Sequence, residues 1–273
     1  FCLSRGLGDV YKRQALLCML AFVWTATAAN PTHTINFTAG GGSPKSAQIN
    51  VYLPQQSNGA AVIICPGGGY SYLEPVKEGS AFAPWFNDMG FALIVLRYRM
   101  PAGEAAVPLT DAETAMRIVR EHAAEWRIDP DKIGIMGASA GGHLASTLAT
   151  QCRPENRPAF QILLYPVITM EEGITHAGSR ENLLGKSPKK KSVTDYSNET
   201  RVTENTPPAF IALSHDDKTV PSENSIRYYR ALSAHQVPAE LHVYPTGGHG
   251  WGFSKQFAYH QQLETALRQW LEC

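Results

Sequence analysis

Short hydrophobic runs recur along the chain and alternate with amphipathic stretches of helical length. Segments 60–65 and 91–96 read Ala-Ala-Val-Ile-Ile-Cys and Phe-Ala-Leu-Ile-Val-Leu. Continuous apolar runs of this kind are typical of parallel strands that are buried on both faces. Segment 110–126 instead places alanine, methionine and valine at helical spacing. Strands that alternate with helices predict an α/β protein, with a mostly parallel central sheet flanked by helices.

The same patterns predict the other elements. Strands are expected at 48–53, 132–136, 161–165, 210–213 and 240–244, and helices at 79–89, 142–150, 222–234 and 256–271. An insert at residues 166–207, rich in Ser, Thr, Asn, Glu and Lys, separates two late strands. Connections this long within a compact domain are usually functional or mobile. Two interpretations stay open: a solvated loop, or a lid over a site.

Size and charge narrow the function classes. The 273 residues are 44% hydrophobic, enough for one large core. Lys plus Arg and Asp plus Glu balance at 24 each, so no electrostatic footprint for nucleic acid or an anionic membrane is expected. Cys65, Cys152 and Cys273 are odd in number and widely spaced, which predicts neither a disulfide framework nor a metal site. No cofactor is expected.

The first residues are set apart from the folded domain. Residues 15–29 hold a short apolar run that leads into Ala-Thr-Ala at 26–28, the pattern of a secretory signal peptide. The run is too short to span a bilayer; a buried core helix is the alternative. Residues 1–14 are interpreted as non-native sequence, which leaves 30–273 for the domain. We expect a secreted or periplasmic protein without a membrane anchor.

A serine lies in a motif with chemical meaning. Gly-Ala-Ser-Ala-Gly at 137–141 fits the Gly-x-Ser-x-Gly nucleophile elbow, a strained strand-to-helix turn. The expected strand 132–136 and helix 142–150 flank it as the motif requires. Cβ atoms at positions 137 and 141 would collide with neighbouring backbone. The motif predicts Ser139 as a nucleophile; a tight glycine turn is the alternative.

An elbow serine needs a base and an orienting acid, in the chain order Ser, Asp, His. His249 follows the last expected strand within Thr-Gly-Gly-His-Gly, a late loop that His143, His176, His215 and His242 lack, so it is the predicted base.

Asp216 and Asp217 both follow the strand 210–213. Asp217 is preferred because it precedes a turn into the next helix at Pro221, while Asp216 remains the alternative.

A glycine run supplies the expected oxyanion hole. Pro-Gly-Gly-Gly-Tyr at 66–70 directly follows the strand 60–65, and consecutive glycines let backbone approach a substrate closely. We expect the N–H groups of Gly68 or Gly69, together with that of Ala140, to bind a developing alkoxide.

With these motifs in place, the sequence resembles bacterial α/β-hydrolase esterases grouped with acetylxylan esterases, feruloyl esterase-like proteins and hormone-sensitive-lipase relatives. The resemblance runs from about residue 45 to the end. The blocks that carry it lie at 65–70, 137–146, 178–185, 206–210, 216–221 and 247–252.

Two departures bear on the substrate. The lipase relatives have His and Asp where this chain has Pro66 and Ala138, which moves it toward the secreted carbohydrate esterases. The resemblance implies an α/β-hydrolase fold and a serine esterase that acts on short acyl esters of plant polysaccharide such as acetylated xylan. A feruloyl or general short-chain esterase is the alternative; a prolyl-oligopeptidase-like peptidase and an inactive binding protein are more distant ones.

Three aromatic residues lie next to the predicted site. Tyr70, Tyr72 and Trp251 neighbour the glycine run or His249 in sequence, and amphipathic rings of this kind can stack on sugar faces. Packing of the loops is the alternative, and the two interpretations are evenly balanced.

Overall fold

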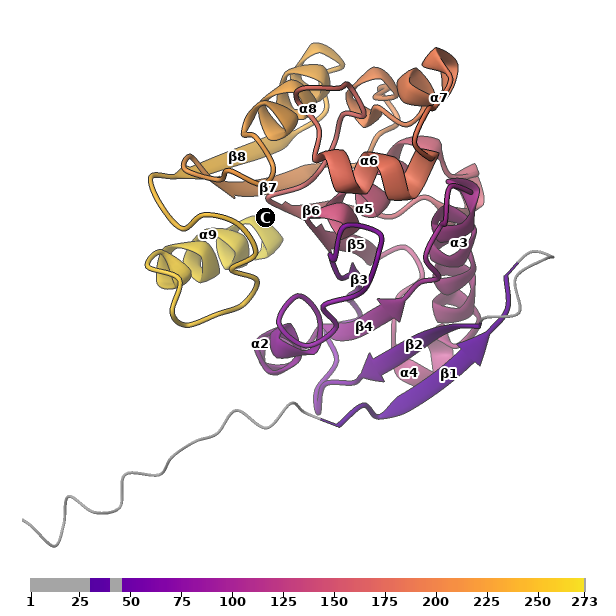
Figure 1. Ribbon diagram of the computed structural model, residues 1–273. Coiled ribbons are helices and arrows are strands. Elements are labelled where there is room, and N and C mark those ends of the chain that lie inside the picture. Colours follow the sequence, from indigo (N-terminus) through magenta and orange to yellow (C-terminus); the bar gives the residue numbers. More distant parts are fainter. Residues whose placement is uncertain (1–29, 40–45, 273) are drawn as a thin grey trace, which may run out of the picture.

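A computed structural model describes residues 30–39 and 46–272, which form one eight-stranded sheet covered by helices (Figure 1). The strand order is β1-β2-β4-β3-β5-β6-β7-β8. The strands are β1 His33–Phe37, β2 Ala47–Tyr52, β3 Ala61–Cys65, β4 Ala92–Arg97, β5 Ile133–Ala138, β6 Gln161–Leu164, β7 Ala209–Ser214 and β8 Ala239–Tyr244. The predicted α/β class is confirmed.

Strand direction brings the predicted site loops together. β2 pairs antiparallel with β1 and β4, and all pairs from β4 to β8 are parallel. In the parallel pair of β3 and β5, Cys65 lies opposite Gly137. The glycine run after β3 and the serine motif after β5 therefore emerge side by side at one edge of the sheet. The edge strand β1 is an addition to the elements that the sequence predicted.

Helices cover both faces of the sheet. One buried apolar cluster includes residues of α3, α5 and α8, and a second, on the opposite face, includes residues of α2 and α9. Figure 1 shows α2 and α9 apart from α3. The helices are α2 Ala83–Asp88, α3 Ala106–Glu121, α4 Ala123–Trp126, α5 Ala140–Gln151, α6 Ala177–Leu184, α7 Lys190–Asp195, α8 Glu223–Ala234 and α9 His260–Glu272, with 3₁₀ turns η1 Ser80–Phe82, η2 Pro154–Asn156 and η3 Asn198–Thr200.

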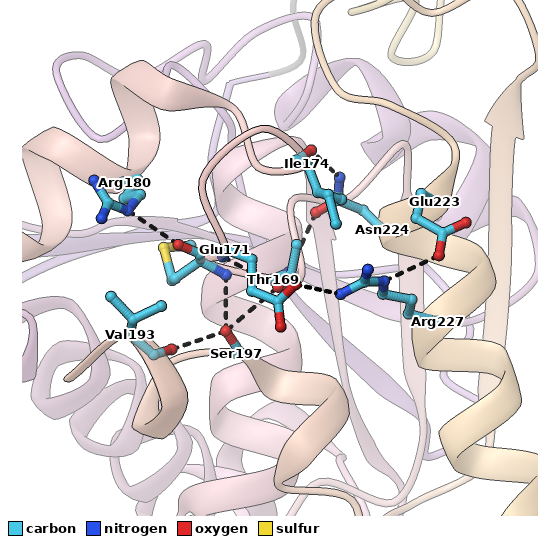
Figure 2. Close-up of polar contacts among 10 residues, drawn as sticks. Thr169, Glu171, Ile174, Arg180, Val193, Ser197, Glu223, Asn224 and Arg227 are labelled. Carbon is cyan, nitrogen blue, oxygen red and sulfur yellow. Dashed lines mark hydrogen bonds and ion pairs between the residues drawn. The ribbon is translucent and has the colours of Figure 1, made fainter. Parts of the chain in front are cut away.

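The insert between β6 and β7 is a folded part of the domain. It contains α6, α7 and η3, and Asn224 at the start of α8 holds its first segment (Figure 2). The Oδ1 atom of Asn224 accepts hydrogen bonds from the N–H groups of Ile168 and Thr169, at 3.0 and 3.2 Å. Its Nδ2 donates to the carbonyl of Ile174 at 3.0 Å. The side chain of Asn224 is fully buried.

A second buried contact joins the two ends of the insert. The hydroxyl of Ser197 donates to the carbonyl of Val193 and accepts the N–H of Met170 at 2.9 Å. Arg180 of α6 donates from Nε to the carbonyl of Met170 at 3.0 Å (Figure 2). Because these polar groups are paired and largely buried, the interpretation of the insert as a solvated loop is wrong.

The N-terminal predictions lie outside the described residues, both for the signal peptide at 15–29 and for the non-native sequence at 1–14. Within 30–39 and 46–272, no helix combines the length and apolar character needed to cross a membrane.

The buried amide of Asn224 gives a stability prediction. Asn224→Ala leaves three backbone groups of the insert, two buried and one partly buried, without their partner, so we expect the free energy of unfolding to fall by about 3 kcal/mol. Thermal unfolding should show a Tm lowered by roughly 6–12 °C. Asn205→Ala, at an exposed position of the same insert, is the matched control. Equal Tm values for the two variants would contradict the anchoring role.

Candidate active site

Ser139 occupies the turn between β5 and α5 in a conformation that side chains rarely adopt. Its φ is 54° and its ψ is −122°, outside the regions that L-residues ordinarily populate. Two hydrogen bonds fix its peptide groups. The N–H of Ser139 donates to the carbonyl of Leu164, and its carbonyl accepts the N–H of Val167, both at 3.0 Å. The end of β6 thus supports the turn.

The glycines of the motif are required by close backbone contacts. A Cβ atom on Gly137 would lie 2.1 Å from the carbonyl oxygen of Gly141, and one on Gly141 would lie 2.0 Å from that of Cys65. Both distances are far below van der Waals contact. The expectation that these positions exclude a side chain is confirmed.

The structure brings Ser139, His249 and Asp217 into one chain of hydrogen bonds. Nε2 of His249 lies 2.8 Å from Oγ of Ser139, and Nδ1 lies 2.6 Å from Oδ2 of Asp217. A carboxylate accepts hydrogen bonds, so Nδ1 carries the proton of the neutral imidazole and Nε2 accepts from the serine hydroxyl. This is the tautomer that a base for Ser139 needs.

The neighbouring carboxylates have different partners. Oδ1 of Asp217 accepts from the N–H groups of Thr219 and Val220 at 2.8 and 2.9 Å, and its side chain is only 1% exposed. These bonds aim its second oxygen at His249. Asp216 instead accepts from the N–H of Gly248 at 2.8 Å. Of the two candidates from the sequence, Asp217 is the one in contact with the histidine.

The glycine run forms a tight turn beside Ser139. Gly68 has a φ of 127°, and a Cβ atom there would lie 2.2 Å from the carbonyl oxygen of Tyr72, so only glycine fits. The N–H of Gly67 donates to Glu78 at 2.9 Å. In the described part of the chain, the N–H groups of Gly68 and Gly69 have no hydrogen-bond acceptor, which leaves two donors for a ligand. The N–H of Ala140 begins α5 and has no partner within the helix.

Two of the three predicted sugar-stacking residues lie in the core instead. Tyr70 is 2% exposed and its hydroxyl is 2.8 Å from Nδ1 of His143. Trp251 is 6% exposed and its ring stacks on Phe257 with centroids 4.3 Å apart. The prediction of a sugar contact is wrong for both, because neighbouring rings and side chains already cover their faces. Tyr72 is 57% exposed, and for it the contact stays a prediction.

Glu78 and Tyr165 form a buried pair near the site that the sequence analysis did not predict. Glu78 is 3% exposed and accepts from the hydroxyl of Tyr165 at 2.7 Å, in addition to its bond with Gly67. The same hydroxyl accepts the N–H of Gly252 at 2.8 Å, and the ring packs edge-on against His249. Burial, and then the charge of Glu78, raise the pKa of Tyr165 well above its usual value. Tyr165 therefore stays protonated. Its hydroxyl donates a hydrogen bond to Glu78 and accepts one from Gly252, which joins the glycine turn to the loop of His249.

The insert contributes two more residues. Asn182 of α6 donates from Nδ2 to the carbonyl of Gly69 at 2.8 Å. His176, which precedes α6, lies beside the same glycine: a Cβ atom on Gly69 would be 3.6 Å from its Cε1. The sequence placed neither of them at the site. The block at 178–185, which carries part of the family resemblance, contains Asn182 but not His176.

Within residues 30–39 and 46–272, no group of three or more His, Cys, Asp or Glu side chains is arranged to hold a metal ion. Cys65 and Cys152 are free thiols, and burial raises the pKa of Cys152 to about 11. Both therefore remain protonated near neutral pH.

The sheet order and the strained serine turn define an α/β-hydrolase, and solved structures agree. The fold matches an acetyl ester-xyloside bifunctional hydrolase from Caldicellulosiruptor lactoaceticus with a TM-score of 0.78 and 35% identity, over 84% of this chain and 89% of that one. The BD-FAE family model matches residues 49–232. The chain belongs to this family of α/β-hydrolase esterases.

Curated relatives point the same way. The chain is 42% identical over 260 residues to an acetylxylan esterase of Xylanibacter ruminicola, covering 94% of this chain and 53% of that protein. It is 37% identical over 204 residues to endo-1,4-beta-xylanase B of Butyrivibrio fibrisolvens, covering 69% of this chain and 32% of that protein. The chain thus spans about half the length of the first relative and about a third of the second.

Proposed function

We propose that this domain is a serine esterase that removes acetyl groups from a plant polysaccharide such as xylan. The observation that carries the proposal is the hydrogen-bonded chain of Ser139, His249 and Asp217 beside the free N–H groups of Gly68 and Gly69. This arrangement meets the requirements of acyl transfer: a nucleophile, a base in the right tautomer, an orienting acid and an oxyanion site.

The first half-reaction forms an acyl-enzyme. Oγ of Ser139 attacks the ester carbonyl carbon while Nε2 of His249 takes its proton. Asp217 holds Nδ1–H and stabilises the imidazolium that results. The carbonyl oxygen, now negative, accepts hydrogen bonds from Gly68, Gly69 and Ala140. Each such donor supplies about 2.7–4 kcal/mol of transition-state stabilisation in comparable enzymes. His249 then gives its proton to the leaving alcohol oxygen, and departure of the alcohol completes the first half-reaction and leaves the acyl-enzyme.

The second half-reaction restores the enzyme. A water molecule then loses a proton to His249 and attacks the acyl carbon, which releases acetate and regenerates the hydroxyl of Ser139.

The substrate class rests on three kinds of support. The relatives are named as an acetylxylan esterase, a xylanase and an acetyl ester-xyloside hydrolase. The apolar run and Ala-x-Ala site in residues 15–29 favour export, and an exported enzyme meets polymers. Tyr72 lies on the turn formed by residues 67–72, which carries Gly68 and Gly69 and is called the oxyanion turn below. Its ring is exposed and is available to a sugar face.

The nucleophile gives the first prediction for this mechanism. Ser139→Ala should lower turnover on an acetyl ester by a factor on the order of 10⁴–10⁶, with a small residual rate from the oxyanion site. A fluorophosphonate probe should label the wild-type chain at Ser139 only. Ser233→Ala, an exposed serine on α8, should keep full activity and labelling. Labelling that survives in Ser139→Ala would overturn the assignment.

The two adjacent aspartates give a matched pair of variants. Asp217→Asn should lower kcat by about 10⁴, since an amide cannot hold the imidazole in the reactive tautomer. Asp216→Asn should cost less than about tenfold, because asparagine keeps an oxygen that can accept the N–H of Gly248 and Asp216 does not contact His249. Steady-state kinetics on one acetyl ester checks both. The reverse order would move the orienting role to Asp216 and leave the nucleophile in place.

Acyl-chain preference tests the substrate class. We expect aryl acetates to be cleaved faster than aryl octanoates, and acetate to be released from acetylated xylan. The measurement compares the hydrolysis rates of acetyl, butyryl and octanoyl esters and of methyl ferulate. A preference for methyl ferulate would make the enzyme a feruloyl esterase, and a preference for octanoate would refute the carbohydrate substrate.

A further inference from the structure

A second imidazole borders the proposed site from the insert. His176 is partly buried, and its Cε1 edge faces Gly69 of the oxyanion turn. Burial is the main cause that lowers its pKa, followed by the positive charge that His249 carries when protonated, while Asp217 acts in the opposite direction. The ring of His176 is therefore close enough to His249 and Asp217 for their charges to change its pKa, although it makes no hydrogen bond to either residue.

Helix α6 fixes the tautomer of this imidazole. His176 is its N-cap residue, and Nδ1 accepts the backbone N–H of Ser179 at 3.2 Å and, at 2.8 Å, the hydroxyl of the same serine. An atom that accepts from a backbone amide carries no proton of its own, so the neutral ring holds its proton on Nε2. Among the described residues, no hydrogen-bond acceptor contacts Nε2. Within residues 30–39 and 46–272, the neutral ring thus presents an N–H donor without a hydrogen-bond partner.

The position of the ring is held firmly. Asn224 binds the carbonyl of Ile174, two residues before His176, and Asn182 ties α6 to the carbonyl of Gly69. Gly178 leaves room beneath the ring, because a Cβ atom there would lie 3.2 Å from Cε1 of His176. A donor fixed in place costs little ordering free energy when a ligand binds.

The reaction geometry says which part of the substrate meets this donor. The carbonyl oxygen must face the N–H groups of Gly68 and Gly69, and the leaving oxygen must lie within reach of His249, which returns a proton to it. The alcohol portion therefore lies on the side of His249, and the charges of His249 and Asp217 that act on His176 put its ring within range of that side.

We propose that His176 binds the alcohol portion of the substrate by donating a hydrogen bond from Nε2 to a sugar hydroxyl or ring oxygen next to the acetylated position. This inference rests on the proposed carbohydrate ester function and adds a residue that selects for it. A sugar oxygen is a neutral acceptor and matches a neutral donor, whereas a 4-nitrophenyl leaving group has no hydroxyl or ring oxygen next to the ester.

The test variant keeps the helix and removes the donor. His176→Asn retains an N-cap acceptor for the N–H of Ser179, since asparagine is among the best N-cap residues. On acetylated xylo-oligosaccharides we expect kcat/KM to fall by about tenfold, mostly through KM, because the contact is present before and during the reaction. On 4-nitrophenyl acetate the fall should be about twofold.

A second variant leaves the imidazole in place. Gly178→Ala puts a Cβ atom against the ring and should displace it by a few tenths of an ångström, which we expect to lower kcat/KM on the sugar ester by about threefold. His235→Asn, the same substitution at an exposed histidine at the end of α8, is the control and should match the wild type on both substrates. Thermal unfolding of each variant verifies that the fold is retained.

Each result decides between named alternatives. A selective loss on the sugar ester in His176→Asn supports the proposal. An equal loss on both substrates overturns it in favour of a structural role, and no loss on either overturns it outright. If the wild type cleaves 4-nitrophenyl acetate but no acetylated xylo-oligosaccharide, the carbohydrate function fails and takes this inference with it.

Discussion

The left-handed backbone at Ser139 is the constraint on which the site depends. A non-glycine residue in such a conformation costs on the order of 1–3 kcal/mol and persists only when its surroundings hold it. Here α5 approaches the end of β5 so closely that Gly137 has no room for a Cβ atom, and the end of β3 leaves none at Gly141. Bonds from Leu164 and Val167 to the peptide groups of Ser139 complete the support. This conformation places Oγ of Ser139 at the edge of the sheet, 2.8 Å from Nε2 of His249.

The loops around this serine are joined by buried polar groups as well as by apolar packing. Glu78 holds the N–H of Gly67 and the hydroxyl of Tyr165, which in turn holds Gly252 in the loop of His249. Loops that follow β3, β6 and β8 therefore share one hydrogen-bonded chain. A buried network of this kind is stabilising only when every member has its partner, so a shift in one loop is opposed by the other two. These hydrogen bonds hold the turn of Gly67 and the loop of His249 in fixed positions relative to each other.

The sequence predicted correctly which residues follow the ends of the strands, but it did not predict the direction in which side chains point. Ser139, Asp217 and His249 were found because each follows a strand whose place in the order is recognisable. Tyr70 and Trp251 were misplaced, since adjacency in sequence does not reveal that a ring turns into the core.

The missed elements have similar physical reasons. The strand β1 has only five residues, partly exposed, so its pattern is weak. Helices α6 and α7 are short and largely polar, and the buried amide of Asn224, fifty residues along the chain from Ile174, is what holds their segment. The role of His176 depends on where α6 begins, which no apolar periodicity marks.

The two histidines at the site illustrate how the same side chain acquires opposite roles. A carboxylate fixes the proton of His249 on Nδ1 and leaves Nε2 as an acceptor, which suits a base. A backbone amide at the start of α6 fixes the proton of His176 on Nε2, which suits a donor. Burial first, and then the charge that His249 would carry in the proposed acyl transfer, lower the pKa of His176 and oppose its protonation. In the proposed mechanism, His249 therefore takes up and releases its proton while His176 stays neutral and remains a hydrogen-bond donor.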